Sequence, residues 1–219
     1  MSLLTKYRIT GSEVLRPSIK QFVKICAETL PIQAPIYEFG SMQVTGQEIF
    51  ADLPPFFPYM KYIGSDISPG PGVDIILNLH EIDLPSESVG TVILCDTIEH
   101  VEYPRKALSE IYRILKPDGI LIITSVMLYN IHAAPNDYWR FTPEGFKSLL
   151  SEFESSYVDW NGKEENPHTI IGVGIKKEYS FDQLISHRDE WRGVQDISLG
   201  NKIFAFNVKL KKDAERKFK

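Results

Sequence analysis

Short apolar runs alternate with amphipathic segments along most of this chain, and the runs have the length of buried strands. The first run, Ile36-Tyr37-Glu38-Phe39-Gly40-Ser41-Met42, predicts a strand that leads into a glycine turn. Similar patterns predict further strands at residues 60–66, 73–79, 91–95, 120–126, 157–160 and 169–176. The run at 120–126 is apolar throughout, as expected for a strand that is covered on both faces.

Segments with apolar residues at helical spacing separate many of these strands. A proline at a first-turn position begins two predicted helices, at residues 17–30 and 104–115. Further helices are predicted at residues 47–53, from Thr142-Pro143 to residue 153, and at residues 181–191. Because strands and helices alternate, we expect an α/β fold with a Rossmann-like, doubly wound, mostly parallel sheet of about seven strands and helices on both faces.

The length of 219 residues fits one domain, since single domains commonly reach ~250 residues. Within residues 1–219 we expect an N-terminal helical segment at 1–33, a core at 34–178 and a C-terminal extension at 179–219. The extension includes a possible added strand at 203–210. It can cap a pocket or form a contact in a homodimer.

The composition of the chain argues against nucleic acid and membranes as partners. The formal net charge of -5 argues against nucleic acid as an electrostatic partner. The longest apolar run, residues 119–129, is too short to span a bilayer, which needs ~20 residues. The N-terminus has no signal-peptide pattern, and the two cysteines do not form a disulfide framework. We therefore expect a cytoplasmic protein that makes no membrane contact.

Acidic residues at two predicted strand ends suggest a ligand site. Glu38 and Gly40 end the first strand, where an acid can accept hydrogen bonds and a glycine permits close approach of a ligand. Asp66 ends the second strand, and dinucleotide folds place a ribose-binding acid ~20 residues after the glycine turn. A carboxylate offers two acceptor oxygens to vicinal hydroxyls. Asp66 can alternatively serve as a turn residue beside Gly64 and Pro69.

The glycine turn itself is a poor phosphate site. Gly40-Ser41-Met42-Gln43 has one glycine, where the G-x-G-x-x-G fingerprint requires three. A pyrophosphate would therefore lack a nest of backbone amides, which argues against an oxidoreductase that uses NAD or FAD. A nucleoside ligand without phosphates fits this turn better.

Five motifs in order carry a family resemblance. They are Glu38-Phe39-Gly40, Gly64-Ser65-Asp66, Asn78-Leu79-His80 with Leu84-Pro85, Cys95-Asp96-Thr97-Ile98-Glu99-His100-Val101, and Arg113-Ile114-Leu115-Lys116-Pro117-Asp118-Gly119. Over about residues 34–153 this order closely resembles class I S-adenosylmethionine-dependent methyltransferases. It looks most like the small-molecule branch, whose fourth strand ends in E-H-V and whose next helix ends in R-x-L-K-P-G-G.

The resemblance implies S-adenosylmethionine as the cofactor, and it implies roles for ten residues. Glu38, Gly40 and Ser41 would lie near its methionine end, Asp66 would bind the ribose and Ile67 would cover the adenine. Asn78, Leu79 and His80 would flank the adenine edge, and Asp96 and Thr97 would line the floor near the sulfonium. This chain departs from the family pattern in two places. The second and third glycines of the loop are missing, and K-P-D-G replaces K-P-G-G. The alternative is a non-catalytic relative that binds an adenosyl ligand or a protein partner.

The segment at residues 130–142 follows the fifth strand and is rich in His, Asp, Tyr, Trp and Arg. In similar methyltransferases such a region helps to form the acceptor pocket. His132 can act as a general base, since its ordinary pKa of ~6.5 suits proton removal near neutral pH. Arg140 can bind an acidic group of a substrate or pair with Asp137. The alternative is a structural loop in which Asp137 and Arg140 form a salt bridge and Trp139 packs.

The spacing of the histidines does not predict a metal site. The histidines at positions 80, 100, 132 and 168 show no H-x-x-x-H spacing, so no metal site is expected. We therefore expect methyl transfer from S-adenosylmethionine to a small-molecule or sugar-like acceptor, with His132, Asp137 and Arg140 as the candidate catalytic residues. The expected step is an in-line displacement at the sulfonium methyl, which depends mainly on the positioning of donor and acceptor.

Overall fold

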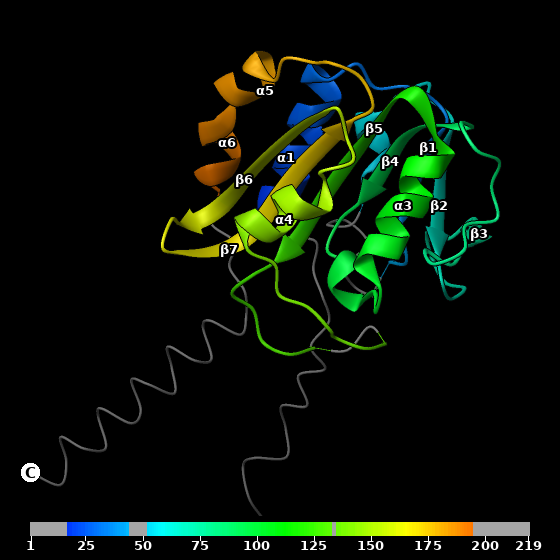
Figure 1. The fold of residues 1–219 in the computed structure, drawn as a ribbon, viewed down its shortest axis with the longest axis horizontal. Coiled ribbons are helices and arrows are strands. Elements are labelled where there is room, and N and C mark those ends of the chain that lie inside the picture. The colour runs from blue at the N-terminus through cyan, green and yellow to red at the C-terminus, as the bar shows by residue number, and fades with distance from the viewer. Residues whose placement is uncertain (1–16, 44–51, 133–134, 195–219) are drawn as a thin grey trace, which may run out of the picture.

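The structure is a computed structural model that describes residues 17–43, 52–132 and 135–194. Its strands are β1 (Ile36–Phe39), β2 (Tyr62–Asp66), β3 (Ile75–Ile76), β4 (Val89–Leu94), β5 (Leu115–Val126), β6 (Ser155–Lys163) and β7 (Asn166–Ile175). They form one sheet in the order β3-β2-β1-β4-β5-β7-β6 (Figure 1). The first five strands are parallel, and β7 runs antiparallel to both β5 and β6. This arrangement confirms the predicted mostly parallel, Rossmann-like sheet of seven strands.

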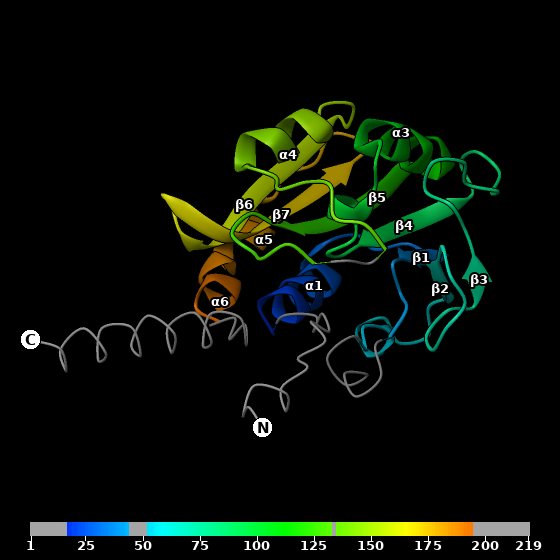
Figure 2. The same ribbon diagram turned by 90° about the horizontal axis from the view of Figure 1, so that it is seen from below.

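Helices cover both faces of the sheet. They are α1 (Pro17–Thr29), α3 (Pro104–Ile114), α4 (Pro143–Leu149), α5 (Asp182–Ser186) and α6 (Arg188–Arg192), with the 3-10 turns η2 (Pro54–Phe56) and η3 (Ile98–His100). Figure 2 shows α3 and α4 on one face and α1 and α6 on the other. In the part of the chain that the structure describes, no helix is both long enough and apolar enough to cross a membrane.

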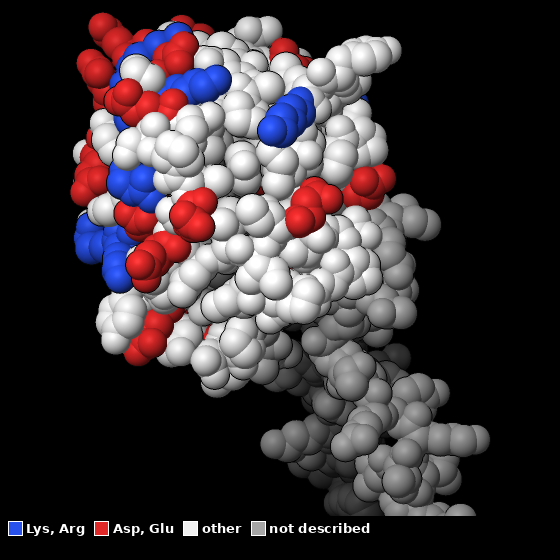
Figure 3. Space-filling view, turned by 90° about the vertical axis from the view of Figure 1, so that its right-hand side faces the viewer, with Lys and Arg blue, Asp and Glu red and all other residues white. Residues whose placement is uncertain are grey.

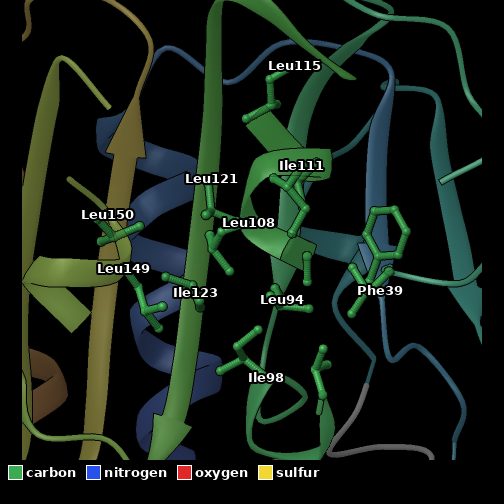
Figure 4. Packing of buried hydrophobic residues seen from close by; sticks show 14 of the residues in the cluster. Phe39, Leu94, Ile98, Leu108, Ile111, Leu115, Leu121, Ile123, Leu149 and Leu150 are labelled. Atoms are coloured by element: carbon green, nitrogen blue, oxygen red, sulfur yellow. The ribbon is translucent and has the colours of Figure 1, made fainter. Parts of the chain in front are cut away.

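The face under α3 and α4 holds one hydrophobic cluster. Proline begins α3, as predicted, and its apolar residues recur at helical spacing so that one side of the helix is buried. Leu108 and Ile111 of α3 point toward the sheet, where Leu121 and Ile123 of β5 lie beside Leu94 of β4 (Figure 4). This packing fixes α3 after the loop that carries η3.

The opposite face holds a second cluster that joins the two ends of the described chain. Phe22 of α1 makes an edge-to-face contact with Trp191 of α6, with ring centroids 5.4 Å apart. Both side chains are fully buried, and Leu184 of α5 belongs to the same cluster. Residues 179–194, which we predicted as part of an extension, therefore complete the helical layer over this face.

Several predicted boundaries shift in the structure. β5 begins at Leu115 rather than at residue 120, because Leu115 pairs with Val89 before a bulge restores pairing at Ile120. β3 is confined to two residues at the sheet edge, and the single predicted helix at 181–191 divides into α5 and α6 at His187. The predicted helix at 47–53 falls mostly outside the described residues, and the predicted strand at 203–210 lies wholly outside them.

We expect Ile111→Ala to lower the free energy of unfolding by about 2–5 kcal/mol, because it leaves a cavity between α3 and the sheet. Ser109→Ala changes an exposed position of the same helix and should shift that free energy by less than about 0.5 kcal/mol. Urea unfolding of both variants measures the difference. Equal effects would contradict the packing described for α3.

Candidate functional site

A cavity of about 470 Å³ lies at the carboxyl ends of β1, β2 and β4. β1 pairs with β2 on one side and with β4 on the other, so the order of strands reverses at β1. Open α/β sheets bind ligands at such a switch point, outside the carboxyl ends of the strands. The cavity therefore has the position that the predicted strand ends indicated.

Eight of the ten residues predicted to contact a cofactor line this cavity. They are Gly40, Asp66, Ile67, Asn78, Leu79, His80, Asp96 and Thr97. The lining also includes His100, Asn136 and Tyr138, to which the sequence analysis gave no role. Asn136 and Tyr138 belong to the segment at 130–142, so the position of that segment after β5 was the signal that could have identified them.

Gly40 brings the ends of β1 and β4 together. Its φ of +81° lies in the left-handed region, and a Cβ atom at this position would overlap with Thr97 Oγ1 and lie 3.0 Å from Thr97 Cγ2. The Thr97 hydroxyl lies 2.9 Å from the Cys95 carbonyl oxygen and 3.3 Å from that of Phe39, so it is held in place. Only glycine satisfies both the backbone conformation and this close approach.

Asp96 has an unusual backbone conformation beside that contact. Its φ of +45° is rare for a residue other than glycine, and such a conformation costs about 1–3 kcal/mol. Two contacts with Thr124 of β5 offset this cost. The Asp96 backbone N–H lies 3.1 Å from the Thr124 hydroxyl oxygen, and that hydroxyl donates to Asp96 Oδ1 at 3.1 Å. Asp96 is therefore held at the cavity wall by both its backbone and its side chain.

The loops that follow β2 and β3 form one wall of the cavity, and hydrogen bonds hold their polar side chains in place. Asp66 Oδ1 accepts the backbone N–H of Ser68 at 3.0 Å, a bond that does not use Oδ2. Asn78 Oδ1 accepts the N–H of His80 at 2.9 Å, and His80 Nε2 accepts the N–H of Tyr103 at 3.2 Å. The orientations of these side chains are thus set by backbone groups of the surrounding loops.

Glu38 and Ser41, the other two predicted cofactor residues, lie behind the cavity wall rather than in its lining. The Ser41 hydroxyl is 2.9 Å from the Gly72 carbonyl oxygen and supports the turn. Glu38 lies two residues after Ile36, which packs against α1, and successive side chains of a strand alternate between its faces. The Glu38 carboxylate accepts the Tyr62 hydroxyl at 2.7 Å. Burial raises the pKa of Glu38 from its ordinary value of 4.5 to about 7, and Asp52 adds to the shift.

The three candidate catalytic residues form a cluster beside the cavity. Both terminal nitrogens of Arg140 donate to the Asp137 carboxylate, at 2.5 and 2.7 Å, and the backbone N–H of His132 donates to it at 2.8 Å. The hydrogen bond from Arg140 lowers the pKa of Asp137 to about 2. The salt bridge that we considered as the structural alternative is thus present, and none of the three residues belongs to the cavity lining.

η3 anchors this segment at the mouth of the cavity. The backbone N–H groups of Tyr138 and Trp139 donate to the Glu99 carbonyl oxygen at 2.9 and 3.2 Å, and the Trp139 indole N–H donates to the Val101 carbonyl oxygen at 3.0 Å. The chain after β5 passes below the carboxyl end of that strand in Figure 1. These bonds bring Tyr138 to the cavity, although Trp139 remains partly exposed.

We expect Gly40→Ala to destabilise the protein by at least about 1–2 kcal/mol from backbone strain alone. The cost should be smaller in a Thr97→Ala background, because the overlapping Oγ1 atom is then absent. A double-mutant cycle measured by urea unfolding isolates this coupling. Gly162→Ala also changes a glycine with positive φ, in the β6–β7 hairpin, and should show no coupling to Thr97. Equal costs of Gly40→Ala in both backgrounds would argue against the close approach.

The raised pKa of Glu38 leads us to expect that the stability of the protein depends on pH. Between about pH 4.5 and pH 7 the folded protein retains a proton on Glu38 that the unfolded chain has lost, so the free energy of unfolding falls as the pH rises through this range. The contribution is fully present below pH 4.5 and is lost above pH 7. Relative to wild type, Glu38→Gln should gain up to about 3 kcal/mol across the range. Urea unfolding of wild type and Glu38→Gln at several pH values measures this difference. If the free energy of unfolding had the same pH dependence in both proteins, the prediction would be wrong.

Comparison with known proteins agrees with this geometry. Residues 51–123, about a third of the chain, match the sequence profile of a family described as a methyltransferase domain. A search of curated proteins found no match. Solved structures with the same fold include an S-adenosylmethionine-dependent methyltransferase of Thermotoga maritima, described as a possible histamine N-methyltransferase. It is 22% identical with a TM-score of 0.52, and the match covers 72% of this chain and 88% of that one.

Two further structures share the fold at lower sequence identity. A methyltransferase of the same cofactor class from Archaeoglobus fulgidus is 15% identical, with a TM-score of 0.51 and coverage of 72% of this chain and 94% of that chain. The 1,6-didemethyltoxoflavin-N1-methyltransferase of Burkholderia thailandensis, solved with S-adenosylhomocysteine, is 13% identical, with a TM-score of 0.54 and coverage of 74% and 80%. Residues 51–123 are thus similar to a methyltransferase domain, and the chain shares its fold with these S-adenosylmethionine-dependent methyltransferases.

Proposed function

We propose that this protein transfers the methyl group of S-adenosylmethionine to a small-molecule or sugar-like acceptor. The observation that carries the proposal is the cavity at the switch point of the sheet, where Gly40, Asp66 and Asp96 lie at or just beyond three neighbouring strand ends. The match to a methyltransferase domain supports it, since residues 51–123 include Asp66 and Asp96.

The cavity suits an adenosyl ligand in size and chemistry. Its volume of about 470 Å³ lies in the ordinary range of small-molecule sites, ~300–1,000 Å³. Asp66 presents a carboxylate to vicinal ribose hydroxyls, and its Oδ2 is not used by the bond to Ser68. Ile67 and Leu79 provide apolar surface for a flat base. The close approach at Gly40 leaves room for a ligand beside the end of β1.

The turn after β1 favours a ligand without phosphates. Gly40 is followed by Ser41, whose hydroxyl is occupied with the Gly72 carbonyl group, rather than by further glycines. Such a turn supplies few converging backbone amides for a pyrophosphate. The same feature argues against nicotinamide dinucleotides, although these bind sheets of the same class.

Bound at this site, the cofactor would supply a methyl group for transfer to a nucleophilic atom of the acceptor, with S-adenosylhomocysteine as the leaving group. The role of the chain is to hold the two reactants in line and to exclude water, which accounts for a large share of catalysis in such a transfer. Asp96 and Thr97 are rigidly placed for this purpose by Thr124 and by the carbonyl groups of Cys95 and Phe39.

The acceptor would enter beside the segment at 130–142. Asn136 and Tyr138 of that segment line the cavity together with His100 and Glu102, so this side has an amide, a phenol, an imidazole and a carboxylate, and none of the described lining residues is a lysine or arginine. Figure 3 views the molecule from the β3 side and shows most charged residues along the left margin, with scattered acidic and basic residues across the rest of the face. An acceptor with hydrogen-bonding groups and no negative charge suits these surroundings. His132, Asp137 and Arg140 would act on it from behind this lining.

Asp66→Asn tests the cofactor site. The variant keeps an amide oxygen for the Ser68 N–H but replaces the other acceptor oxygen with a donor, so S-adenosylhomocysteine should bind about 10–100-fold more weakly. Asp83→Asn alters an exposed acid outside the cavity lining and should leave the affinity unchanged. Calorimetric titration with S-adenosylmethionine and S-adenosylhomocysteine, and with NADH as a negative control, measures these affinities.

Two results would count against the proposal. Equal affinities of wild type and Asp66→Asn would contradict the ribose-binding role of Asp66. Failure of wild-type protein to bind either adenosyl ligand would contradict the function itself, and would favour a non-catalytic relative that binds a protein partner.

A further inference from the structure

Three side chains from two separate segments meet at the rim of the cavity. Glu99 and His100 belong to η3, and His132 follows β5. One carboxylate oxygen of Glu99 and one ring nitrogen of each histidine lie within 4.8 Å of one another. Sequence spacing does not reveal this cluster, because the two histidines come from segments that the fold brings together.

The hydrogen bonds of His100 set its tautomer. Its Nδ1 lies 2.5 Å from the carbonyl oxygen of Asn136, which can only accept a hydrogen bond. Nδ1 therefore carries the proton, and Nε2 of the neutral ring is the atom with the lone pair. His100 also lines the cavity, so this nitrogen lies close to the ligand space.

His132 has the same arrangement. Its Nδ1 lies 3.0 Å from the Asn130 carbonyl oxygen and 3.3 Å from Asp137 Oδ2, both of which are acceptors. A longer contact of 3.5 Å joins the same atom to Arg140, whose charge is already paired with Asp137. The proton of the neutral ring thus belongs on Nδ1, and the lone pair again lies on Nε2.

The two Nε2 atoms are 3.1 Å apart. Two neutral rings with these tautomers would direct lone pairs at one another, which is unfavourable unless a proton or a metal ion lies between them. Zinc and similar ions bind imidazole nitrogen at ~2.0–2.1 Å, which places two nitrogen ligands of one ion about 3 Å apart. The observed separation therefore matches a pair of metal ligands. In metal sites the other ring nitrogen ordinarily donates to a carbonyl or carboxylate group, as both rings do here.

Glu99 provides an independent observation. Its side chain is 0% exposed, and Oε2 accepts the Ser125 hydroxyl at 2.7 Å. Oε1 is buried and has no hydrogen-bond partner in the structure, which is a rare and costly condition for a carboxylate oxygen.

We propose that Glu99, His100 and His132 bind one divalent transition-metal ion at the rim of the cavity. Two imidazoles with one carboxylate favour Zn²⁺, Mn²⁺, Fe²⁺ or Co²⁺ over Mg²⁺ and Ca²⁺, which prefer oxygen ligands. Three protein ligands leave at least one coordination position for another molecule. Since His100 lines the cavity, the ion would lie beside the space assigned to the acceptor.

The ion would select a class of acceptor, an inference that rests on the proposed function. A metal at this position binds a hydroxyl oxygen of the acceptor and lowers its pKa, so the favoured acceptors are alcohols, phenols or vicinal diols. Asp137 and the carbonyl groups of Asn130 and Asn136 would orient the two imidazoles. Arg140 would be held away from the ion by its two bonds to Asp137.

Metal binding is measured directly on the full chain after treatment with a chelator. Titration with Co²⁺ and Zn²⁺, followed by calorimetry and by the visible bands of Co²⁺, should give one ion per chain, with Mg²⁺ bound much more weakly. Glu99→Gln and His132→Gln should weaken the binding of Co²⁺ by at least about tenfold. His187→Gln removes an exposed imidazole at the start of α6 and is the matched control, with unchanged affinity.

A second measurement does not depend on how the variants fold. The electron paramagnetic resonance spectrum of Cu²⁺ bound to wild-type protein should show splitting from two imidazole nitrogens. Fewer than one Co²⁺ per chain, a Cu²⁺ spectrum without two nitrogens, or equal loss of binding in His187→Gln would each overturn the proposal. Titration of chelator-treated protein with S-adenosylhomocysteine tests the cofactor site separately, so failure of one site is distinguishable from failure of the other.

Discussion

The close approach of Gly40 to Thr97 is the constraint on which the cavity depends. It joins the end of β1 to the loop after β4, and these two strands are neighbours in the sheet although two other strands separate them along the chain. A side chain at Gly40 would push the two loops apart, and Asp96 would lose its position beside Thr124. The floor of the site is thus defined by backbone packing rather than by a flexible side chain.

Two buried carboxyl groups, those of Glu38 and Glu99, flank this floor and differ in their hydrogen-bond partners. Glu38 and Glu99 both have a pKa raised to about 7, mainly because burial disfavours their charged forms. Glu38 has a hydroxyl partner in Tyr62 and supports the turn from behind. Glu99 has one satisfied oxygen and one that is not, and its backbone carbonyl group anchors the segment that carries Tyr138. Similar electrostatics therefore accompany a supporting role for Glu38 and, for Glu99, a buried oxygen without a hydrogen-bond partner beside the two histidines.

The anchoring of the segment at 130–142 links the fold to the proposed chemistry. Because Glu99 and Val101 accept its N–H groups, this segment and η3 form one wall, and His132 reaches His100 as a result. The salt bridge between Asp137 and Arg140 ties residues 137–140 together, and neither side chain belongs to the cavity lining. Recognition of an acceptor and binding of an ion would then share one rigid support.

The local pattern of apolar and polar residues in the sequence was enough to predict most of the architecture. Apolar runs and prolines at helix starts predicted β1, α3 and the alternation of elements, because burial of one face imposes a period on the sequence that is visible without the structure. An acid and a glycine at strand ends likewise predicted where the cavity lies, with Gly40 and Asp66 in its lining, since the carboxyl ends of parallel strands meet at one edge. The resemblance of five ordered motifs added the cofactor.

Tertiary structure alone decided contacts between segments that are distant in sequence. The early start of β5 depends on its pairing with Val89, and the burial of Trp191 depends on α1, so neither follows from local spacing. Glu38 lies outside the cavity lining because alternation along β1 places its side chain on the same face as Ile36, which packs against α1. The meeting of His100 and His132 requires the whole path of β5 between them, which is the physical reason that no sequence spacing could indicate it.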